Sequence, residues 1–213
     1  MNQWKRFIIL LEKVKNCSFL KEYNVIIRLF GILLVVITWD CAGNKYKQMA
    51  SSNPNKLLSI EDSLLQSSSK TYIAHSIALA HKTLGDSAIT EGDYEKAKDH
   101  FTKALKLSPS DSLYMYNQLM VEGHLLQKSG KKDKLWSSIQ SYNKAAAIFE
   151  RAGDPYYYIG NSYLKLSDKD FDLIIESYEK ALALELSTDL REQVIQARER
   201  VSMREKKLKN FWK

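Results

Sequence analysis

Nonpolar residues recur at intervals of three or four along most of the chain beyond residue 70, and Gly and Pro are scarce, with eight and three in 213 residues. Residues at that spacing share one face of a helix, and no run of alternating β-branched residues competes with this pattern. The pattern therefore predicts an all-α fold. We expect a short helix near 57–66 and longer helices at 70–91, 93–108, 112–129, 134–152, 155–166, 170–186 and 189–209.

The two predicted helices on either side of Gly92 carry small and large residues in a fixed order: His81, Leu84, Gly85 and Ala88, then Ala97, Phe101, Ala104 and finally Pro109. Helical spacing places them on two facing stripes, and the small size of Gly85 and Ala97 lets the helices approach closely. Gly92 suits a left-handed helix end, and Asp93 can cap the helix that follows.

This order of residues resembles the tetratricopeptide repeat, a helix–turn–helix unit of 34 residues. The match covers Leu84, Gly85, Ala97, Phe101, Ala104 and Pro109. The chain differs from the family at His81 and Ala88, where the family has Trp and Tyr. The resemblance implies stacked helix pairs, and it specifies a fold more closely than a function because the matched residues are packing residues.

The pattern recurs twice downstream, with longer turns. The equivalent glycines are Gly85, Gly123 and Gly160, and the equivalent aromatic residues are Phe101, Tyr142 and Tyr178. Three repeats are about the minimum for a stable stack, and such an array needs a cap with one polar side. We expect repeats at 57–188 (about 70–111, 112–154 and 155–188), followed by a capping helix with a basic tail at 189–213. Ahead of the repeats we expect a signal or anchor segment at 1–41 and a polar tether at 42–56.

In the tetratricopeptide family the first helices line a concave groove that binds an extended peptide or a partner helix. The resemblance places these residues on that groove: Lys82, Asp86, Ile89, Asn117, Met120, His124, Gln127, Tyr157, Asn161 and Leu164. Members that clamp a carboxylate use a Lys/Asn/Arg set on this face. Asp86 stands where Asn is expected and would repel a carboxylate, so that clamp is not predicted. The alternative for each residue is packing against the neighbouring repeat.

Residues 29–39 form a nonpolar or weakly polar run of 11 residues. This is short of the roughly 20 residues that span a bilayer, but it fits the 7–15-residue core of a secretory signal. Cys41 follows, with small and polar residues behind it. The segment resembles a bacterial lipoprotein signal, which implies lipidation of Cys41, although Asp40 stands where that family has a small residue. The alternatives are an uncleaved anchor, an ordinary signal, or core helices of a soluble protein.

The net charge of +7 is concentrated at the two ends of the chain. Residues 1–41 hold six Lys or Arg against three Asp or Glu, residues 204–213 hold five against one, and the middle is balanced. The basic tail could contact phosphates of nucleic acid or lipid. The alternative is a solvated helix end whose cations suit the helix dipole. Nucleic acid is not the expected partner, because no nucleic-acid-binding fold accompanies the tail.

No catalytic or metal-binding motif stands out. There is no Gly-rich phosphate loop, nucleophile elbow or His-Glu-x-x-His sequence, and two cysteines form no zinc pattern. We expect His81 to pack between helices and His100 to be exposed. No catalytic residue, metal or cofactor is predicted. The sequence instead favours a protein-binding scaffold at a bacterial envelope, with its repeats facing the periplasm and the membrane reached through the N-terminal segment. The alternative is a soluble or cytosol-facing adaptor whose basic tail contacts nucleic acid or anionic lipid.

Overall fold

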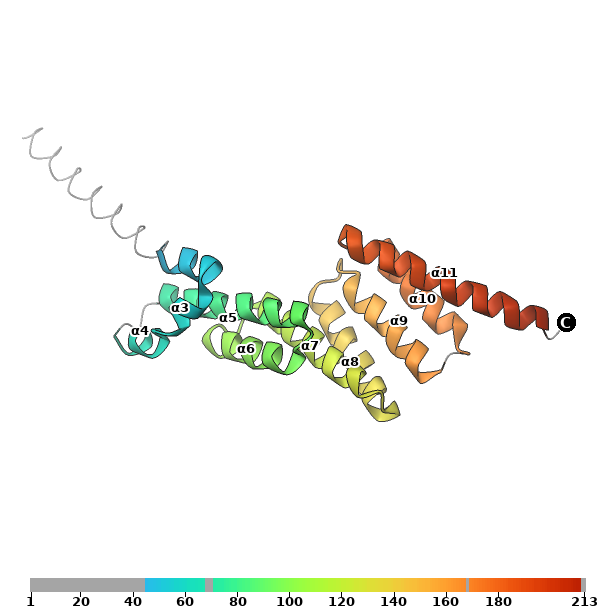
Figure 1. Cartoon of the computed structure of the whole chain (residues 1–213), viewed down its shortest axis with the longest axis horizontal. Coiled ribbons are helices and arrows are strands. Elements are labelled where there is room, and N and C mark those ends of the chain that lie inside the picture. Colours follow the sequence, from blue (N-terminus) through green and yellow to red (C-terminus); the bar gives the residue numbers. More distant parts are fainter. Residues whose placement is uncertain (1–44, 68–70, 168, 212–213) are drawn as a thin grey trace, which may run out of the picture. The chain divides into compact units, whose positions relative to one another are not determined.

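The computed structural model describes residues 45–67, 71–167 and 169–211. These residues form an all-α stack of helix pairs, as the sequence predicts (Figure 1). The described helices are α3 (Pro54–Leu58), α4 (Glu61–Ser67), α5 (Thr71–Glu91), α6 (Tyr94–Leu107), α7 (Ser112–Ser129), α8 (Lys132–Ile148), α9 (Asp154–Leu166), α10 (Phe171–Ala183) and α11 (Thr188–Phe211). From α5 to α11 each helix packs against the next one in the chain, and α3 and α4 pack against α5.

The turn between α5 and α6 is formed as the sequence predicts. Gly92 has a φ of 76°, in the left-handed region where glycine is favoured. The side chain of Asp93 caps α6 by accepting a hydrogen bond of 3.0 Å from the backbone N–H of Lys96. Gly130 ends α7 in the same left-handed conformation, with a φ of 70°. These local signals make each helix pair reverse direction within a few residues.

A large aromatic side chain from the second helix of each repeat packs onto a glycine of the first. Phe101, Tyr142 and Tyr178 are fully buried. A Cβ atom added to the facing glycine would lie 2.7 Å from the ring of Phe101, 2.3 Å from that of Tyr142 and 2.5 Å from that of Tyr178. No side chain fits at Gly85, Gly123 or Gly160, so glycine is required there by the close approach of the ring.

Two helices end earlier than the periodicity predicts. Helix α8 stops at Ile148 and α10 at Ala183, rather than at 152 and 186. The segments that follow them are hydrogen-bonded to each other: the N–H of Gly153 donates to the carbonyl of Glu185, and the N–H of Glu185 donates to the carbonyl of Arg151, both at 2.8 Å. These bonds use backbone groups that a longer helix would need for itself.

The predicted signal core at 29–39 and Cys41 lie outside the described residues. Residues 45–52, which fall within the predicted polar tether, are helical, and Ala50 is fully buried. The short helix expected near 57–66 is instead two, α3 and α4. Within the described part of the chain, no helix combines the length and the apolar character needed to cross a membrane.

Candidate functional site

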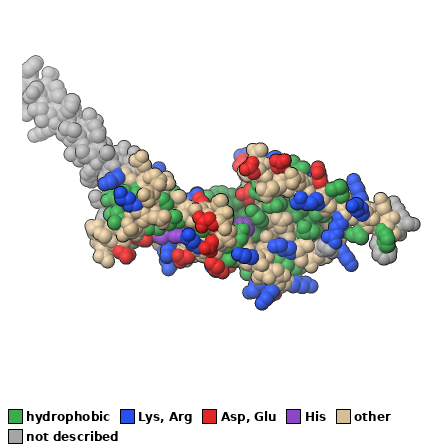
Figure 2. Space-filling model, viewed as in Figure 1, with side chains coloured by type: hydrophobic (Ala, Val, Ile, Leu, Met, Phe, Trp, Pro, Cys, Tyr) green, Lys and Arg blue, Asp and Glu red, His purple; other side chains and the backbone are tan. Residues whose placement is uncertain are grey.

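The three groove residues predicted in the third repeat lie around one cavity. Tyr157, Asn161 and Leu164 of α9 line a space of about 260 Å³. The other lining residues are Tyr178 from α10 and Ala197, Arg200, Val201 and Arg204 from α11. The walls are therefore partly apolar and partly polar, and the capping helix supplies two guanidinium groups. Figure 2 shows Lys and Arg side chains gathered at the α11 end of the molecule.

Asn161 has one side of its amide already engaged. Its Oδ1 accepts a hydrogen bond of 2.7 Å from the hydroxyl of Tyr178, whose pKa is raised because the ring is buried. The amide N–H groups of Asn161 remain as donors beside the cavity. The ring of Tyr157 lies 5.9 Å from that of Tyr178 and gives apolar area next to those donors. This arrangement can take a nonpolar group that carries a hydrogen-bond acceptor or a negative charge.

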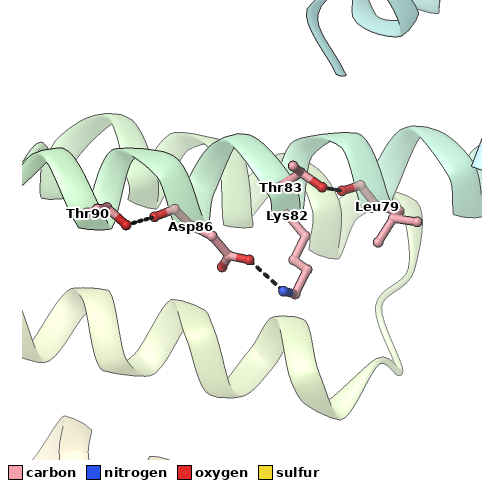
Figure 3. A network of polar contacts seen from close by, with 5 residues as sticks. All are labelled: Leu79, Lys82, Thr83, Asp86 and Thr90. Atoms are coloured by element: carbon pink, nitrogen blue, oxygen red, sulfur yellow. Dashed lines mark hydrogen bonds and ion pairs between the residues drawn. The ribbon is translucent and has the colours of Figure 1, made fainter. Parts of the chain in front are cut away.

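In the first repeat the predicted groove residues pair with each other. The ammonium group of Lys82 is 2.6 Å from Oδ2 of Asp86, one turn along α5 (Figure 3). The Lys82 charge is thus balanced by a carboxylate of its own helix. Ile89 is partly buried against the cluster that contains Phe101.

In the second repeat two predicted groove residues belong to the core instead. Met120 and His124 are 6% and 8% exposed. Met120 packs in the cluster that contains Tyr142, and Nδ1 of His124 lies 2.9 Å from the hydroxyl of that tyrosine. The prediction that both side chains face a partner is wrong, because the Tyr142 ring and its hydroxyl hold them inside. Asn117 remains half-buried on α7.

Gln127 joins the second repeat to the third. Its side-chain amide donates to the carbonyl of Tyr158 at 3.0 Å and to the hydroxyl of Ser162 at 2.7 Å. Ser162 in turn lies 2.9 Å from the hydroxyl of the fully buried Ser138. The alternative stated for groove residues, packing against the neighbouring repeat, thus applies to Gln127.

The imidazole of His124 is enclosed by aromatic rings. Its ring centroid is 4.4 Å from that of Tyr158 in an edge-on arrangement and 5.0 Å from that of Tyr94. Burial lowers the pKa of His124 to about 4, so the side chain is neutral at pH 7. A neutral imidazole can accept a hydrogen bond at Nδ1 from the hydroxyl of Tyr142.

One arrangement recurs in the second and third repeats and involves the residue that directly follows the packing glycine. In these two repeats, the residue after the packing glycine contacts the tyrosine whose ring lies on that glycine. Where the ring is tyrosine, this residue bonds its hydroxyl: His124 with Tyr142 and Asn161 with Tyr178. Where the ring is Phe101 there is no hydroxyl, and Asp86 pairs with a lysine on its own helix. The sequence indicated only that a buried tyrosine needs a hydrogen-bond partner, and it did not specify which residue supplies the bond.

The histidine pair of the first repeat is a further contact that the sequence did not reveal. His81 is buried, as expected, but His100 is only half-exposed because its Nδ1 lies 3.1 Å from Nδ1 of His81. The Nε2 of His81 lies 3.4 Å from a carboxylate oxygen of Glu61. Burial lowers the pKa of both histidines. Over the described residues, no group of three His, Cys, Asp or Glu side chains has a geometry that could hold a metal ion.

Comparison with known protein families supports the resemblance to the tetratricopeptide repeat. Residues 78–111 match the tetratricopeptide repeat family. The chain has a tetratricopeptide-like fold. The matched segment comprises most of α5 and all of α6. It contains Phe101 and its facing Gly85, and it is the helix pair in which the sequence pattern is clearest.

The curated relatives and solved structures that resemble the chain are distant. The Hsp70-Hsp90 organizing protein of Triticum aestivum is 28% identical over 107 residues, which is 49% of this chain but only 18% of that protein. The Sgt2 TPR domain from Aspergillus fumigatus is 18% identical, with a TM-score of 0.43 over 62% of this chain and 82% of that one. The first TPR of Spaghetti (RPAP3), solved with the HSP90 peptide SRMEEVD, is 20% identical, with a TM-score of 0.41 over 59% of this chain and 95% of that one.

Proposed function

We propose that this chain is a non-catalytic scaffold that binds a partner protein through the cavity between α9 and α11. The observation that supports it most directly is the common cavity of Tyr157, Asn161 and Leu164. These residues were expected on a binding surface from the sequence, and the structure adds Arg200 and Arg204 beside them. The match of residues 78–111 to a repeat family also favours a scaffold.

The chemistry of the cavity indicates what kind of partner segment fits. Tyr157 and Leu164 offer apolar surface, and the amide N–H groups of Asn161 and the guanidinium of Arg200 offer donors. A nonpolar side chain next to a carboxylate would satisfy both. The partner segment is therefore expected to be partly apolar and acidic, and its binding should weaken as salt is added.

Replacing Tyr157 with Ala is expected to weaken a captured partner by on the order of 1–2 kcal/mol, the range for an interface aromatic residue. The ring supplies apolar area in the cavity and its hydroxyl can hydrogen-bond the bound segment. Arg200→Ala should weaken the same partner without touching the core, because the side chain is exposed. Affinity is measured by calorimetry with the partner recovered by pull-down.

Lys144→Ala on α8 is the matched control, since this exposed lysine does not line the cavity. Tyr157 also packs against buried core residues, so thermal unfolding of each variant checks that the fold is kept. Unchanged affinity in a protein with Tyr157, Asn161 and Lys82 all replaced would show that this surface is not the binding site.

We further propose that the scaffold is tethered to the bacterial envelope through residues 29–39, with the repeats outside the cytoplasm. The support is the length of the nonpolar run and the positions of Lys21 and Arg28 ahead of it. Mass spectrometry of the mature N-terminus is expected to find a diacylated Cys41 or a cleaved signal. An intact Met1 in the soluble fraction would contradict the proposal. Release from membranes by salt rather than detergent would favour the alternative, an adaptor attached through its basic tail.

A further inference from the structure

A second and larger cavity lies where α8 ends and α9 begins. Its volume is about 760 Å³, within the range of ligand-binding pockets. The walls are largely apolar, with Tyr116 from α7, Phe149 after α8 and Leu186 before α11. The rings of Tyr116 and Phe149 meet edge-on, with their centroids 5.1 Å apart.

The charged groups of this cavity are unevenly balanced. Its only cation among the described lining residues is Arg151, which is engaged in an ion pair with Glu185. The carboxylates of Glu150 and Asp154 are left, and no ion pair is found for either within the described part of the chain. Burial raises the pKa of Asp154, which shows that its charge lacks full solvation or compensation.

An apolar cavity with uncompensated carboxylates suits the side chain of a lysine or arginine. The hydrocarbon stem of such a residue packs against apolar walls while its charged end meets a carboxylate. The aromatic rings can also attract a cation at their faces. The cavity therefore fits a basic segment that has nonpolar residues on the same face.

The end of α11 is a segment of this kind. Met203, Lys207 and Phe211 are spaced four residues apart and share one helix face. Met203 and Phe211 are 56% and 79% exposed, and Lys207 is exposed between them. This face points away from the buried stripe of Val194, Ala197 and Val201, which packs toward the third repeat.

A helix end cannot reach the cavity of its own chain. Residues Leu186 and Ser187, at the cavity, directly precede α11, and the helix then runs 24 residues, or about 36 Å, away from them. A second copy has no such restriction. With two α11 helices antiparallel, the end of each lies near the start of the other, so one two-fold axis places both ends at both cavities.

We propose that this chain forms a dimer in which the Met203–Lys207–Phe211 face of each α11 docks into the cavity lined by Glu150 and Asp154 of the other copy. The inference is independent of the partner-binding cavity between α9 and α11, because the two cavities share no residue. It assigns the acidic cavity to self-association and leaves the other free for a partner.

Charge exchange in the full chain tests the dimer. Sedimentation velocity, in a density-matched non-ionic detergent, is expected to show a concentration-dependent dimer that weakens with salt. Lys207→Glu and Glu150→Lys should each raise the dissociation constant about tenfold or more, since like charges then face each other. Both substitutions in one chain should restore the dimer. Lys134→Glu, at the far end of α8, is the matched control and should leave it unchanged.

An equal mixture of ¹⁴N- and ¹⁵N-labelled chains gives a second measurement. Carbodiimide cross-linking followed by mass spectrometry should yield mixed-isotope peptide pairs that join Lys206 or Lys207 to Glu150, Asp154 or Glu185. A chain that stays monomeric overturns the proposal. So does a dimer that is indifferent to both single substitutions, or a double variant as weak as the single ones. Capture of a basic segment from another protein by the monomer would also assign the cavity to a different occupant.

Discussion

Replacing Phe101 with Ala is expected to lower the free energy of unfolding by roughly 3–5 kcal/mol, the usual cost of truncating a buried phenylalanine. The ring is fully buried and packs on Gly85, in a cluster with Ala88, Ala97 and Val121. Its removal leaves a cavity between the two helices of the first repeat and α7. Denaturant unfolding followed by circular dichroism measures the change.

Lys98→Ala is the control for the Phe101 variant, because Lys98 is exposed on the same helix. Its effect should stay within about 0.5 kcal/mol. Gly85→Ala places a Cβ against the ring and should be destabilising alone, but less so when Phe101 is already Ala. A loss below about 1 kcal/mol for Phe101→Ala, or strict additivity of the pair, would contradict the packing of ring on glycine.

Acidification from pH 7 to pH 4 is expected to remove roughly 3 kcal/mol of stability through His124 alone. Its pKa is about 4 in the folded protein, below the ordinary value of 6.5, because burial disfavours the charged ring. The unfolded chain therefore takes up the proton first. The contribution of His124 is fully present above pH 6.5 and is lost as the pH falls toward 4.

His124→Asn isolates this effect from the other titrating groups. Asparagine cannot gain a proton, and it can bond the Tyr142 hydroxyl as Asn161 bonds Tyr178. His81 and His100 also have lowered pKa values and weaken the protein in acid, whereas the raised pKa of Asp154 acts in the opposite sense. These contributions remain in the variant. The free energy of unfolding of the wild-type protein should therefore fall by roughly 3 kcal/mol more than that of the variant between pH 7 and pH 4. Parallel curves would show that His124 is not buried as a neutral ring.

Local signals in the sequence were sufficient for the helices and their pairing. Gly92 and Asp93 define the first turn with only local bonds, and the spacing of Gly85 and Phe101 states which faces meet. The same spacing makes Tyr142 and Tyr178 the equivalents of Phe101, and the structure shows all three fully buried. These features depend on residues close in sequence or on one aromatic–glycine contact, so the amino-acid order alone contains them.

The candidate site was only partly predictable from the sequence. Tyr157, Asn161 and Leu164 were expected together from one helix face, and the structure places them at one cavity. Arg200 and Arg204 were assigned only to a capping helix and a basic tail. Both flank the nonpolar residue Val201, but their approach to α9 depends on how α11 packs against the third repeat.

The sequence by itself determined the all-α class and the glycine–aromatic packing within the repeats, because these follow from periodicity and from the volume of single side chains. Only the tertiary structure decided which polar residues turn inward and where helices stop. His124 lies in the core and not on the groove because it hydrogen-bonds the hydroxyl of Tyr142, 18 residues along the chain. Helices α8 and α10 ended early because Gly153 and Glu185 hydrogen-bond across the stack. A hydrogen bond or a pKa shift depends on neighbours that only folding brings together, and no local pattern specifies them.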